Sequence, residues 1–248
     1  MKKVFILIFA FFAFAPFAKA SNNIADDFRN HFGVHSNLSA YNKDISSLIG
    51  IADFHTGRGT TFPGFDIGVT MTAIKPSSSN NISSEDYIYT GFLSAETKIP
   101  VVGLGVVVRG TDMNGFESLG GGLKYNFSVL DTVHFALGAF YDRAKTEWYT
   151  QDHYSASASA SMNVLFLTPY VGIGYDYGEI KIHGFDVEWR DSYGNSVDIY
   201  TVDRSSSDGA VRYTAGVNFK PFPFVYVFAS YTKTAGNEGF QGGLGLNF

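Results

Sequence analysis

Along most of the chain, apolar and polar residues alternate with a period of two. The clearest example is segment 154–164, where Tyr, Ala, Met and Val side chains alternate with Ser and Asn. Segments 65–73, 119–127, 171–177 and 211–220 repeat the pattern. Because successive side chains of a β-strand point to opposite faces, this period indicates strands with one apolar and one polar or small face. A helix would distribute the same residues around its surface.

The connections between these segments are of two kinds. The short ones are 98–100, 128–132, 166–169 and 220–223. The long, polar ones are 76–86, 110–117, 142–153, 178–209 and 233–239. Short turns at one end and long loops at the other are typical of bacterial outer-membrane barrels, which have short periplasmic turns.

The pattern predicts an all-β fold, an antiparallel up-and-down transmembrane β-barrel of about ten strands. The expected strands are 64–74, 87–97, 101–110, 117–127, 133–142, 153–165, 169–178, 210–220, 224–233 and 239–248. An even number of strands leaves the first and the last strand with their free ends in the periplasm. Segment 180–203 is expected to form a hairpin above the membrane, turning at 191–195, and if it crossed the membrane the count would be twelve.

A soluble periplasmic β-sandwich would also alternate. Strands of about ten residues and a polar face rich in Ser and Gly, with few charges, favour the barrel instead. We therefore assign the protein to the bacterial outer membrane.

The first twenty residues have the layout of an export signal. Lys2 and Lys3 precede an apolar run at 4–17, and Ala18-Lys19-Ala20 forms an A-x-A cleavage site. We expect residues 1–20 to be a cleaved signal peptide.

Residues 21–60 do not follow the strand rhythm. Ile24, Phe28 and Phe32 recur at helical spacing, a second helix is expected at 36–48, and 49–54 is expected to be a short strand. This N-terminal helical segment is either a plug in the lumen or a periplasmic appendage, and the barrel occupies 61–248.

The C-terminal residues resemble the β-signal that the barrel-assembly machinery reads in outer-membrane proteins. The match consists of Gln241, Gly243, Leu246 and the terminal Phe248. The resemblance implies that this machinery is a partner during biogenesis, through addition of the amphipathic edge strand to another sheet.

A narrower resemblance is carried by the N-terminal helix, the Gly-rich stretch 49–64, and segments 65–69 and 168–175. These resemble an uncharacterised family of small outer-membrane barrels, distantly similar to the long-chain fatty-acid channels with an N-terminal hatch. The resemblance implies a role in handling small molecules, although the chain is too short for a fourteen-stranded channel.

Composition narrows the chemistry. The 248 residues include 27 glycines and no cysteine, which excludes disulfides and thiolate metal sites. The net charge of −5 does not indicate binding to nucleic acid, which requires basic surfaces. The sequence contains no motif for a metal or cofactor, and we expect none. The expected partners are outer-membrane lipid and lipopolysaccharide, with the protein a monomer.

One pair of residues offers a catalytic alternative. His153 and Ser155 face the same side of a strand and resemble the His-x-Ser pair of lipid A deacylases, which would imply a lipid-modifying hydrolase. Ser155 also begins a run of alternating serines, which small-residue lining of a narrow lumen explains without catalysis. We expect the protein not to be an enzyme.

The strongest functional signal is a set of charged residues expected to face the lumen. They are Asp66, Glu96, Arg109, Lys124, Asp142, Asp176, Arg212 and Lys220. They either pair across a closed lumen or line a conduit that selects solutes. Passage or handling of small molecules is the leading hypothesis. The alternative is a structural or surface-interaction barrel, adhering through the acidic loop 178–209, with a sealed lumen.

Overall fold

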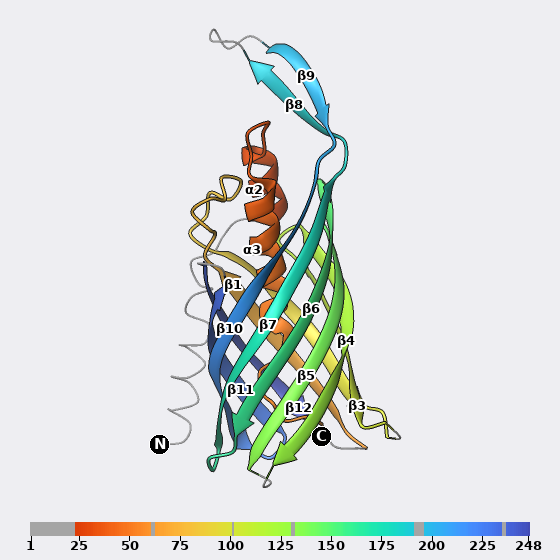
Figure 1. Ribbon diagram of the computed structural model, residues 1–248, viewed down its shortest axis with the longest axis vertical. Coiled ribbons are helices and arrows are strands. Elements are labelled where there is room, and N and C mark those ends of the chain that lie inside the picture. Colours follow the sequence, from red (N-terminus) through yellow and green to blue (C-terminus); the bar gives the residue numbers. More distant parts are fainter. Residues whose placement is uncertain (1–22, 61–62, 101, 130–131, 191–195, 235–236) are drawn as a thin grey trace.

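The computed structural model describes residues 23–60, 63–100, 102–129, 132–190, 196–234 and 237–248. Ten antiparallel strands close into a barrel in the order β1-β12-β11-β10-β7-β6-β5-β4-β3-β2, as the sequence predicts (Figure 1). The barrel strands are β1 (Phe65–Ile74), β2 (Ile88–Lys98), β3 (Leu104–Met113), β4 (Phe116–Val129), β5 (Val133–Lys145), β6 (Tyr149–Met162), β7 (Leu167–Ile182), β10 (Ser205–Phe222), β11 (Val225–Thr234) and β12 (Asn237–Asn247).

The alternating pattern sorts side chains between lipid and lumen. On the outer face, Leu119 is 69% exposed and Leu93 is 62% exposed, whereas the inward Thr72 and Thr90 are fully buried. A closed barrel with an apolar outer surface has no unpaired edge and suits only a membrane. The barrel therefore spans the outer membrane.

Aromatic side chains gather near both ends of this apolar surface. Phe248 lies 5.2 Å from Phe65 and 5.8 Å from Phe224 between ring centroids, at the end where the chain terminates. Towards the other end, Tyr154 lies 5.1 Å from Tyr141 and 6.4 Å from Tyr177. Such clusters are typical of the aromatic girdles at the two membrane interfaces.

The predicted loop lengths are partly wrong. Strands β3 and β4 continue through 110–117 and meet at a tight turn, where Asn114 and Gly115 both have positive φ. Strands β5 and β6 likewise extend until only 146–148 separates them. These polar segments remain strands because each pairs with a neighbouring strand. The barrel wall therefore extends beyond its apolar, lipid-facing surface. The long connections at this end are 75–87 and the 183–204 segment.

The 183–204 segment contains a hairpin, as predicted. Strands β8 (Phe185–Arg190) and β9 (Ser196–Val202) pair only with each other and project beyond the barrel end (Figure 1). The hairpin does not enter the barrel wall, so the twelve-strand alternative is wrong. The turn predicted at 191–195 lies outside the described residues.

Within the described part of the N-terminal segment, residues 23–60, two α-helices precede the barrel. In α2 (Ile24–His31), the Asn23 side chain accepts a hydrogen bond from the Ala25 backbone N–H at 2.9 Å. In α3 (Leu38–Gly50), Asn37 caps the Ala40 N–H at 3.2 Å. Such N-caps satisfy amide donors that have no partner within the helix.

The short strand predicted at 49–54 is wrong. Helix α3 runs to Gly50 and continues into the 3₁₀ turn η2 (Ile51–Asp53). The wall strands already pair with one another around the closed ring, so this segment has no edge to join. It satisfies its own backbone as a helix instead.

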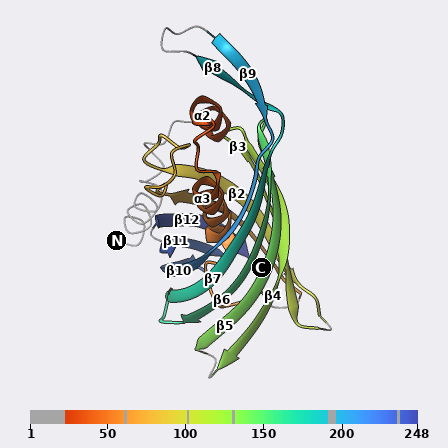
Figure 2. The ribbon, with the colours of Figure 1, turned by 45° about the horizontal axis from the view of Figure 1, so that its top comes forward.

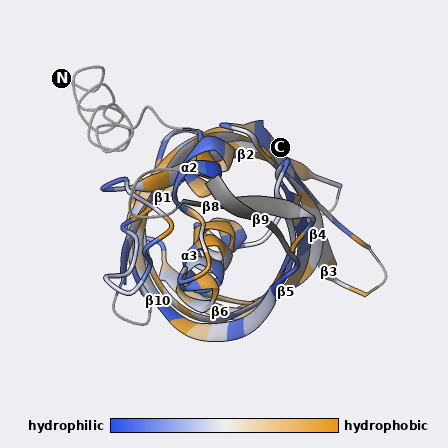
Figure 3. Cartoon of the chain, turned by 90° about the horizontal axis from the view of Figure 1, so that it is seen from above, coloured by the Kyte–Doolittle hydropathy of each residue, from blue (hydrophilic) through white to orange (hydrophobic). Residues whose placement is uncertain are grey.

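The N-terminal segment runs through the barrel from one end to the other. Helix α3 stands inside the ring of strands when the barrel is seen along its axis (Figure 3). Helix α2 lies at the end that carries the β8–β9 hairpin (Figure 2). At the other end, β1 begins beside the C-terminus, where Asp66 pairs with Asn247 of β12. Because short turns and the barrel termini mark the periplasmic end, α2 lies at the extracellular mouth.

The predicted export signal is not part of this description. The signal peptide predicted at 1–20 lies outside the described residues. Among the residues that are described, no helix is long and apolar enough to cross a membrane.

Candidate functional site

The candidate site is the interior of the barrel, which the N-terminal segment fills in layers. In the outer layer, Phe28 of α2 contacts Tyr41 of α3 and Tyr149 of β6, with ring centroids 5.3 and 5.0 Å apart. Ile45, Leu48 and Ile49 extend the same buried cluster along α3. This apolar cluster packs the N-terminal helices against the inner wall in the extracellular half of the lumen.

Below the apolar layer, Asp53 joins the N-terminal segment to opposite parts of the wall. Its Oδ1 lies 3.0 Å from Arg109 Nη1 of β3, and its Oδ2 accepts a hydrogen bond from Arg212 Nη2 of β10 at 2.6 Å. Each arginine also has a carboxylate partner on the wall. We refer to Asp53, Arg109, Asp142, His153, Asp176 and Arg212 as the lumen charge cluster.

Within this cluster, each arginine makes a two-point contact with its wall partner. Arg109 donates from Nε and Nη2 to Asp142 of β5 at 2.7 and 2.6 Å. Arg212 donates from Nε and Nη2 to Asp176 of β7 at 2.9 and 3.2 Å. Fork-to-fork pairs of this kind are strong and directional, and they hold the planar guanidinium in one orientation.

Strand register explains why Arg109 reaches Asp142 across an intervening strand. Gly120 of β4 lies opposite Arg109 on one side and opposite Asp142 on the other. A Cβ at Gly120 would overlap the Asp142 carboxylate. The glycine therefore leaves the space that the ion pair occupies, which agrees with the close approach expected of a glycine within a strand.

The cluster has an unequal number of opposite charges. Three carboxylates face two guanidinium groups, which leaves one negative charge when His153 is neutral. His153 lies between the carboxylates, with Nδ1 3.2 Å from Asp142 and Nε2 3.5 Å from Asp176. A protonated imidazole would balance the cluster. All six residues are buried.

The His153–Ser155 arrangement does not have hydrolase geometry. Ser155 Oγ donates a hydrogen bond to Asp53 at 2.8 Å, and the His153 contacts go to Asp142 and Asp176. A catalytic pair needs the nucleophile within hydrogen-bond reach of its base. Here both side chains contact carboxylates of the lumen charge cluster, which lies inside the barrel and away from the lipid.

The other four sequence-predicted lumen charges lie nearer the periplasmic end. Lys124 Nζ pairs with Glu96 Oε2 at 2.7 Å. Asp66 accepts hydrogen bonds from the Tyr226 hydroxyl at 2.6 Å and from Asn247 at 3.0 Å. Lys220 lies with them around a small cavity of about 20 Å³. A cavity of this size holds about one water molecule.

Several important residues were missed from the sequence, chiefly those of the N-terminal segment itself. Asp53 stood out only as an acidic residue in the apolar run 49–54, which we assigned to a strand. His55 stacks on Tyr226 and Phe228 in the lower lumen, at centroid distances of 4.7 and 4.6 Å. Nothing in a single sequence indicates these contacts, because they join segments far apart in the chain.

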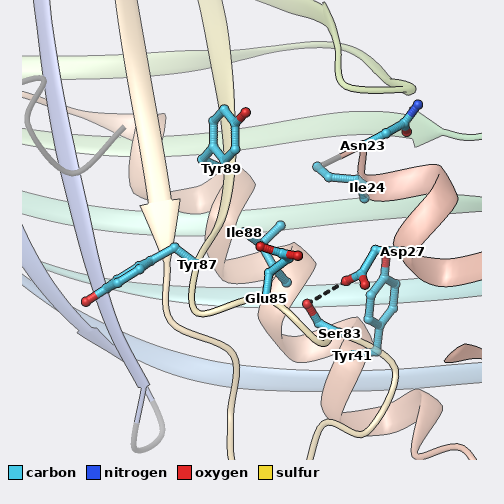
Figure 4. Close-up of a pocket in the computed structure, with 9 residues that line it drawn as sticks. All are labelled: Asn23, Ile24, Asp27, Tyr41, Ser83, Glu85, Tyr87, Ile88 and Tyr89. Carbon is cyan, nitrogen blue, oxygen red and sulfur yellow. Dashed lines mark hydrogen bonds between the residues drawn. The ribbon is translucent and has the colours of Figure 1, made fainter. Parts of the chain in front are cut away.

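At the extracellular rim, α2 is attached to the 75–87 loop. Asp27 accepts a hydrogen bond from the Ser83 hydroxyl at 2.8 Å (Figure 4). It accepts a second one from the Ser84 hydroxyl, also at 2.8 Å. The Ile24 N–H also donates to the Asn114 carbonyl in the β3–β4 turn at 2.8 Å. These bonds fix α2 over the mouth of the barrel.

The predicted assembly-signal residues lie on β12 and at the chain end. Gln241 faces inward and accepts a hydrogen bond from Ser230 Oγ at 3.0 Å, and Gly243 leaves room for the Phe228 ring. Leu246 and Phe248 are exposed on the outer side. Their role in assembly stays a prediction.

The described residues hold no group of three or more His, Asp or Glu side chains arranged to bind a metal ion. Within the lumen charge cluster, the guanidinium groups of Arg109 and Arg212 donate hydrogen bonds to the carboxylate oxygens that a metal cation would need as ligands. The site is therefore one of ion pairing.

No family model and no curated protein matches the sequence. Among solved structures, the chain is similar to Ail, the attachment invasion locus protein of Yersinia pestis, with 16% identity, a TM-score of 0.34, and coverage of 75% of this chain and 97% of that one. It is similar to the KdgM porin, with 8% identity, a TM-score of 0.38, and coverage of 74% and 99%. It is also similar to the translocator domain of autotransporter NalP from Neisseria meningitidis, with 11% identity, a TM-score of 0.42, and coverage of 82% of this chain and 94% of that one.

These similar structures include bacterial outer-membrane barrels with different roles, and at such scores they do not discriminate between functions. The apolar outer face and closed strand order of this chain place it in the same membrane. The resemblance to fatty-acid channels stays a prediction.

Proposed function

We propose that the protein is a sealed outer-membrane barrel that acts at the cell surface as an interaction protein. The observation that carries the proposal is the filling of the lumen by residues 24–60, fastened through the two contacts of Asp53 with Arg109 and Arg212. A channel would need this segment to move, and movement would leave buried charges without partners, which costs several kcal/mol (about 3–5).

The extracellular end supports a surface role. Helix α2 and the 75–87 loop are joined through Asp27, so they form one ordered platform over the mouth. The β8–β9 hairpin rises beyond this platform. An ordered outer surface on a membrane-anchored barrel is suited to contact with molecules outside the cell.

Passage of small molecules is the second candidate. The observation in its favour is the charge on the inner wall, where Arg109, Asp142, Asp176 and Arg212 would line a polar conduit if the N-terminal segment moved aside. Rings of charge select solutes in known pores.

A cross-link between the N-terminal segment and the wall tests sealing. Thr56 and Ser161 of β6 have hydroxyl oxygens 3.4 Å apart, and the chain has no cysteine of its own. The double variant Thr56→Cys/Ser161→Cys can therefore form one disulfide. In planar bilayers we expect no discrete conductance steps from the wild type or from the variant, whether oxidised or reduced.

Passage would instead be supported if the wild type and the reduced variant both conducted, and if oxidation of the variant abolished its conductance and reduction restored it. Asp53→Ala serves as the opening variant, since it leaves the wall strands unchanged and removes the contacts of Asp53 with Arg109, Arg212 and Ser155. We expect it to conduct where the wild type does not. The exposed Arg58→Ala is the matched control and should stay silent.

Surface interaction is tested on intact cells. Removing residues 185–202 deletes the β8–β9 hairpin and leaves the ten-stranded barrel closed. We expect attachment of expressing cells to mucin-coated wells to fall, with unchanged amounts of protein in the outer membrane. Equal attachment by both forms would contradict an interaction through the hairpin.

A further inference from the structure

A hollow opens at the periplasmic end of the barrel, between the turn that joins β6 to β7 and the turn that joins β10 to β11. The two turns are neighbours because β7 pairs with β10, where Leu167 lies opposite Phe219. The hollow has a volume of about 410 Å³ and is lined by Leu165, Phe166, Lys220, Pro221, Phe222 and Pro223. Five of these six residues are apolar and the sixth is a lysine. The hollow therefore combines an apolar surface with one cation.

The two turns are held against each other. The Lys220 backbone N–H donates a hydrogen bond to the Phe166 carbonyl at 2.9 Å, and the rings of Phe166 and Phe219 meet edge to face at a centroid distance of 5.6 Å. Within the β6–β7 turn, the backbones of Val164 and Leu167 exchange two hydrogen bonds. A site that is ordered before binding loses less entropy when a ligand enters.

The Lys220 side chain has no counter-ion in the part of the chain that the structure describes. It forms neither an ion pair nor a hydrogen bond with a described residue. The residue is half-buried, yet its Nζ is not enclosed and stays in contact with solvent. An accessible, unpaired ammonium group beside an apolar hollow suits an anionic group that approaches from outside the barrel.

The charges around Lys220 also favour an anion. Lys220 lines the small cavity at the periplasmic end of the lumen together with Arg58, Lys124, Asp66 and Glu96. Three basic side chains thus face two carboxylates, an excess of one positive charge. Glu96 is already paired with Lys124 at 2.7 Å, and both Asp66 oxygens accept hydrogen bonds from the barrel wall. The excess positive charge lies at the end of the barrel that carries the hollow.

The level of the hollow along the barrel indicates what covers it. The side chains of Phe166, Phe222 and Phe224 are each more than half exposed, and the Phe224 ring stacks on Phe248 at 5.8 Å. They belong to the aromatic girdle at the periplasmic interface, and such girdles lie at the level of the lipid headgroups. The neighbouring molecules at this level are phospholipids, whose phosphate groups are anionic and whose glycerol and acyl parts are apolar.

We propose that the hollow binds one anionic phospholipid of the periplasmic leaflet. Lys220 contacts the phosphate oxygens, while Phe222 and Pro223 contact the glycerol and the upper part of an acyl chain. The volume of 410 Å³ falls in the range of about 300–1,000 Å³ that is typical of small-molecule sites. A headgroup with a net negative charge binds more tightly than a zwitterionic one, because the excess positive charge attracts it. The site lies at the opposite end of the barrel from the proposed interaction surface and does not depend on it.

Native mass spectrometry of the protein purified from the outer membrane in detergent tests this proposal. Phosphatidylglycerol and phosphatidylethanolamine with identical acyl chains are titrated separately. We expect a saturable complex with one lipid, formed more tightly by phosphatidylglycerol. Lys220→Gln should weaken the binding of phosphatidylglycerol about fivefold, the contribution of one lysine near an anionic headgroup. Lys220→Arg keeps the charge and should keep the preference.

Lys233→Gln is the matched control, since Lys233 is an exposed lysine at the other end of the barrel, in β11, and does not line the hollow. It makes the same change of charge and should bind phosphatidylglycerol like the wild type. Inorganic phosphate is added as a competitor in a further arm. It should not displace the lipid, because it lacks the apolar groups that contact Phe222 and Pro223. The comparison of the two lipids on the wild type needs no variant.

The proposal is overturned if the wild type binds the two lipids equally, or if Lys220→Gln binds phosphatidylglycerol as tightly as Lys233→Gln. Displacement of the lipid by inorganic phosphate would also overturn it, since the site would then be one for free anions. Conductance by the wild-type barrel would contradict the proposed function and leave lipid binding unchanged, so each conclusion can fail without the other.

Discussion

Asp53 and Arg212 meet at 2.6 Å inside the barrel although 159 positions separate them in the chain. Asp53 belongs to the segment that fills the lumen, and Arg212 to a wall strand. Arg109 contacts the other oxygen of the same carboxylate at 3.0 Å. The N-terminal segment is thus fastened to two strands, β3 and β10, that do not pair with each other.

Arg212→Met should destabilise the barrel strongly. It leaves Asp176 without its arginine and removes one of the two arginine contacts of Asp53, and loss of one partner from a buried ion pair costs about 3–5 kcal/mol. Thermal unfolding in detergent micelles measures the loss. Arg143→Met is the control, because Arg143 is 63% exposed and pairs with Asp152 at the surface, where such a pair contributes at most about 1 kcal/mol. Equal effects of the two variants would contradict the role of the cluster.

Gly120→Ala should disturb the Arg109–Asp142 pair without removing any charge. The added methyl group overlaps the Asp142 carboxylate, and forcing extra volume into a filled interior costs about 1–3 kcal/mol. Gly33→Ala makes the same chemical change where a Cβ meets nothing within 4 Å. Its free energy of unfolding should lie within about 0.5 kcal/mol of the wild-type value. Unfolding curves for the pair compare the two sites directly.

Asp44 should make stability depend on pH. Burial raises the pKa of this carboxyl to about 6, although hydrogen bonds from Ser77, Asn80 and Asn237 act to lower it. Because the folded pKa lies above the unfolded value, the contribution of Asp44 is present below about pH 4 and is lost as the pH rises through about 6. The shift corresponds to about 3 kcal/mol.

The measurement is unfolding free energy at several pH values between 4 and 7 for the wild type and Asp44→Asn. We expect the wild type to lose stability over this interval more steeply than the variant. Parallel curves would show that Asp44 does not titrate there.

Phe248→Ala should impair insertion. The Phe248 N–H donates to the Phe65 carbonyl at 2.9 Å where the last strand meets the first, and its ring contacts Phe65 and Phe224. We expect less folded protein in the outer membrane, seen as loss of the heat-modifiable band on gels. Leu165→Ala, at a residue 93% exposed in a periplasmic turn, should insert normally. Normal insertion of both variants would refute the assembly signal.

Much of the wall could be predicted from local pattern. Ten strands, the external hairpin and both helices were expected near their observed positions, because side-chain alternation and helical spacing are properties of each segment by itself. The errors at 110–117 and 142–153 came from taking polar composition as a sign of loops. Strand pairing continues wherever a neighbour is available, and polarity there reflects water outside the membrane.

The sequence by itself determined which side chains face the lumen, since a period of two assigns Arg109, Asp142, Asp176 and Arg212 to one face of their strands. Only the tertiary structure decided their partners. Closure and register brought Asp142 to Arg109 across Gly120, and the descent of the N-terminal segment brought Asp53 between the two arginines. The physical reason is that an ion pair acts over a few ångströms, whereas its partners here lie far apart in the chain, from 33 positions for Arg109 and Asp142 to 159 for Asp53 and Arg212.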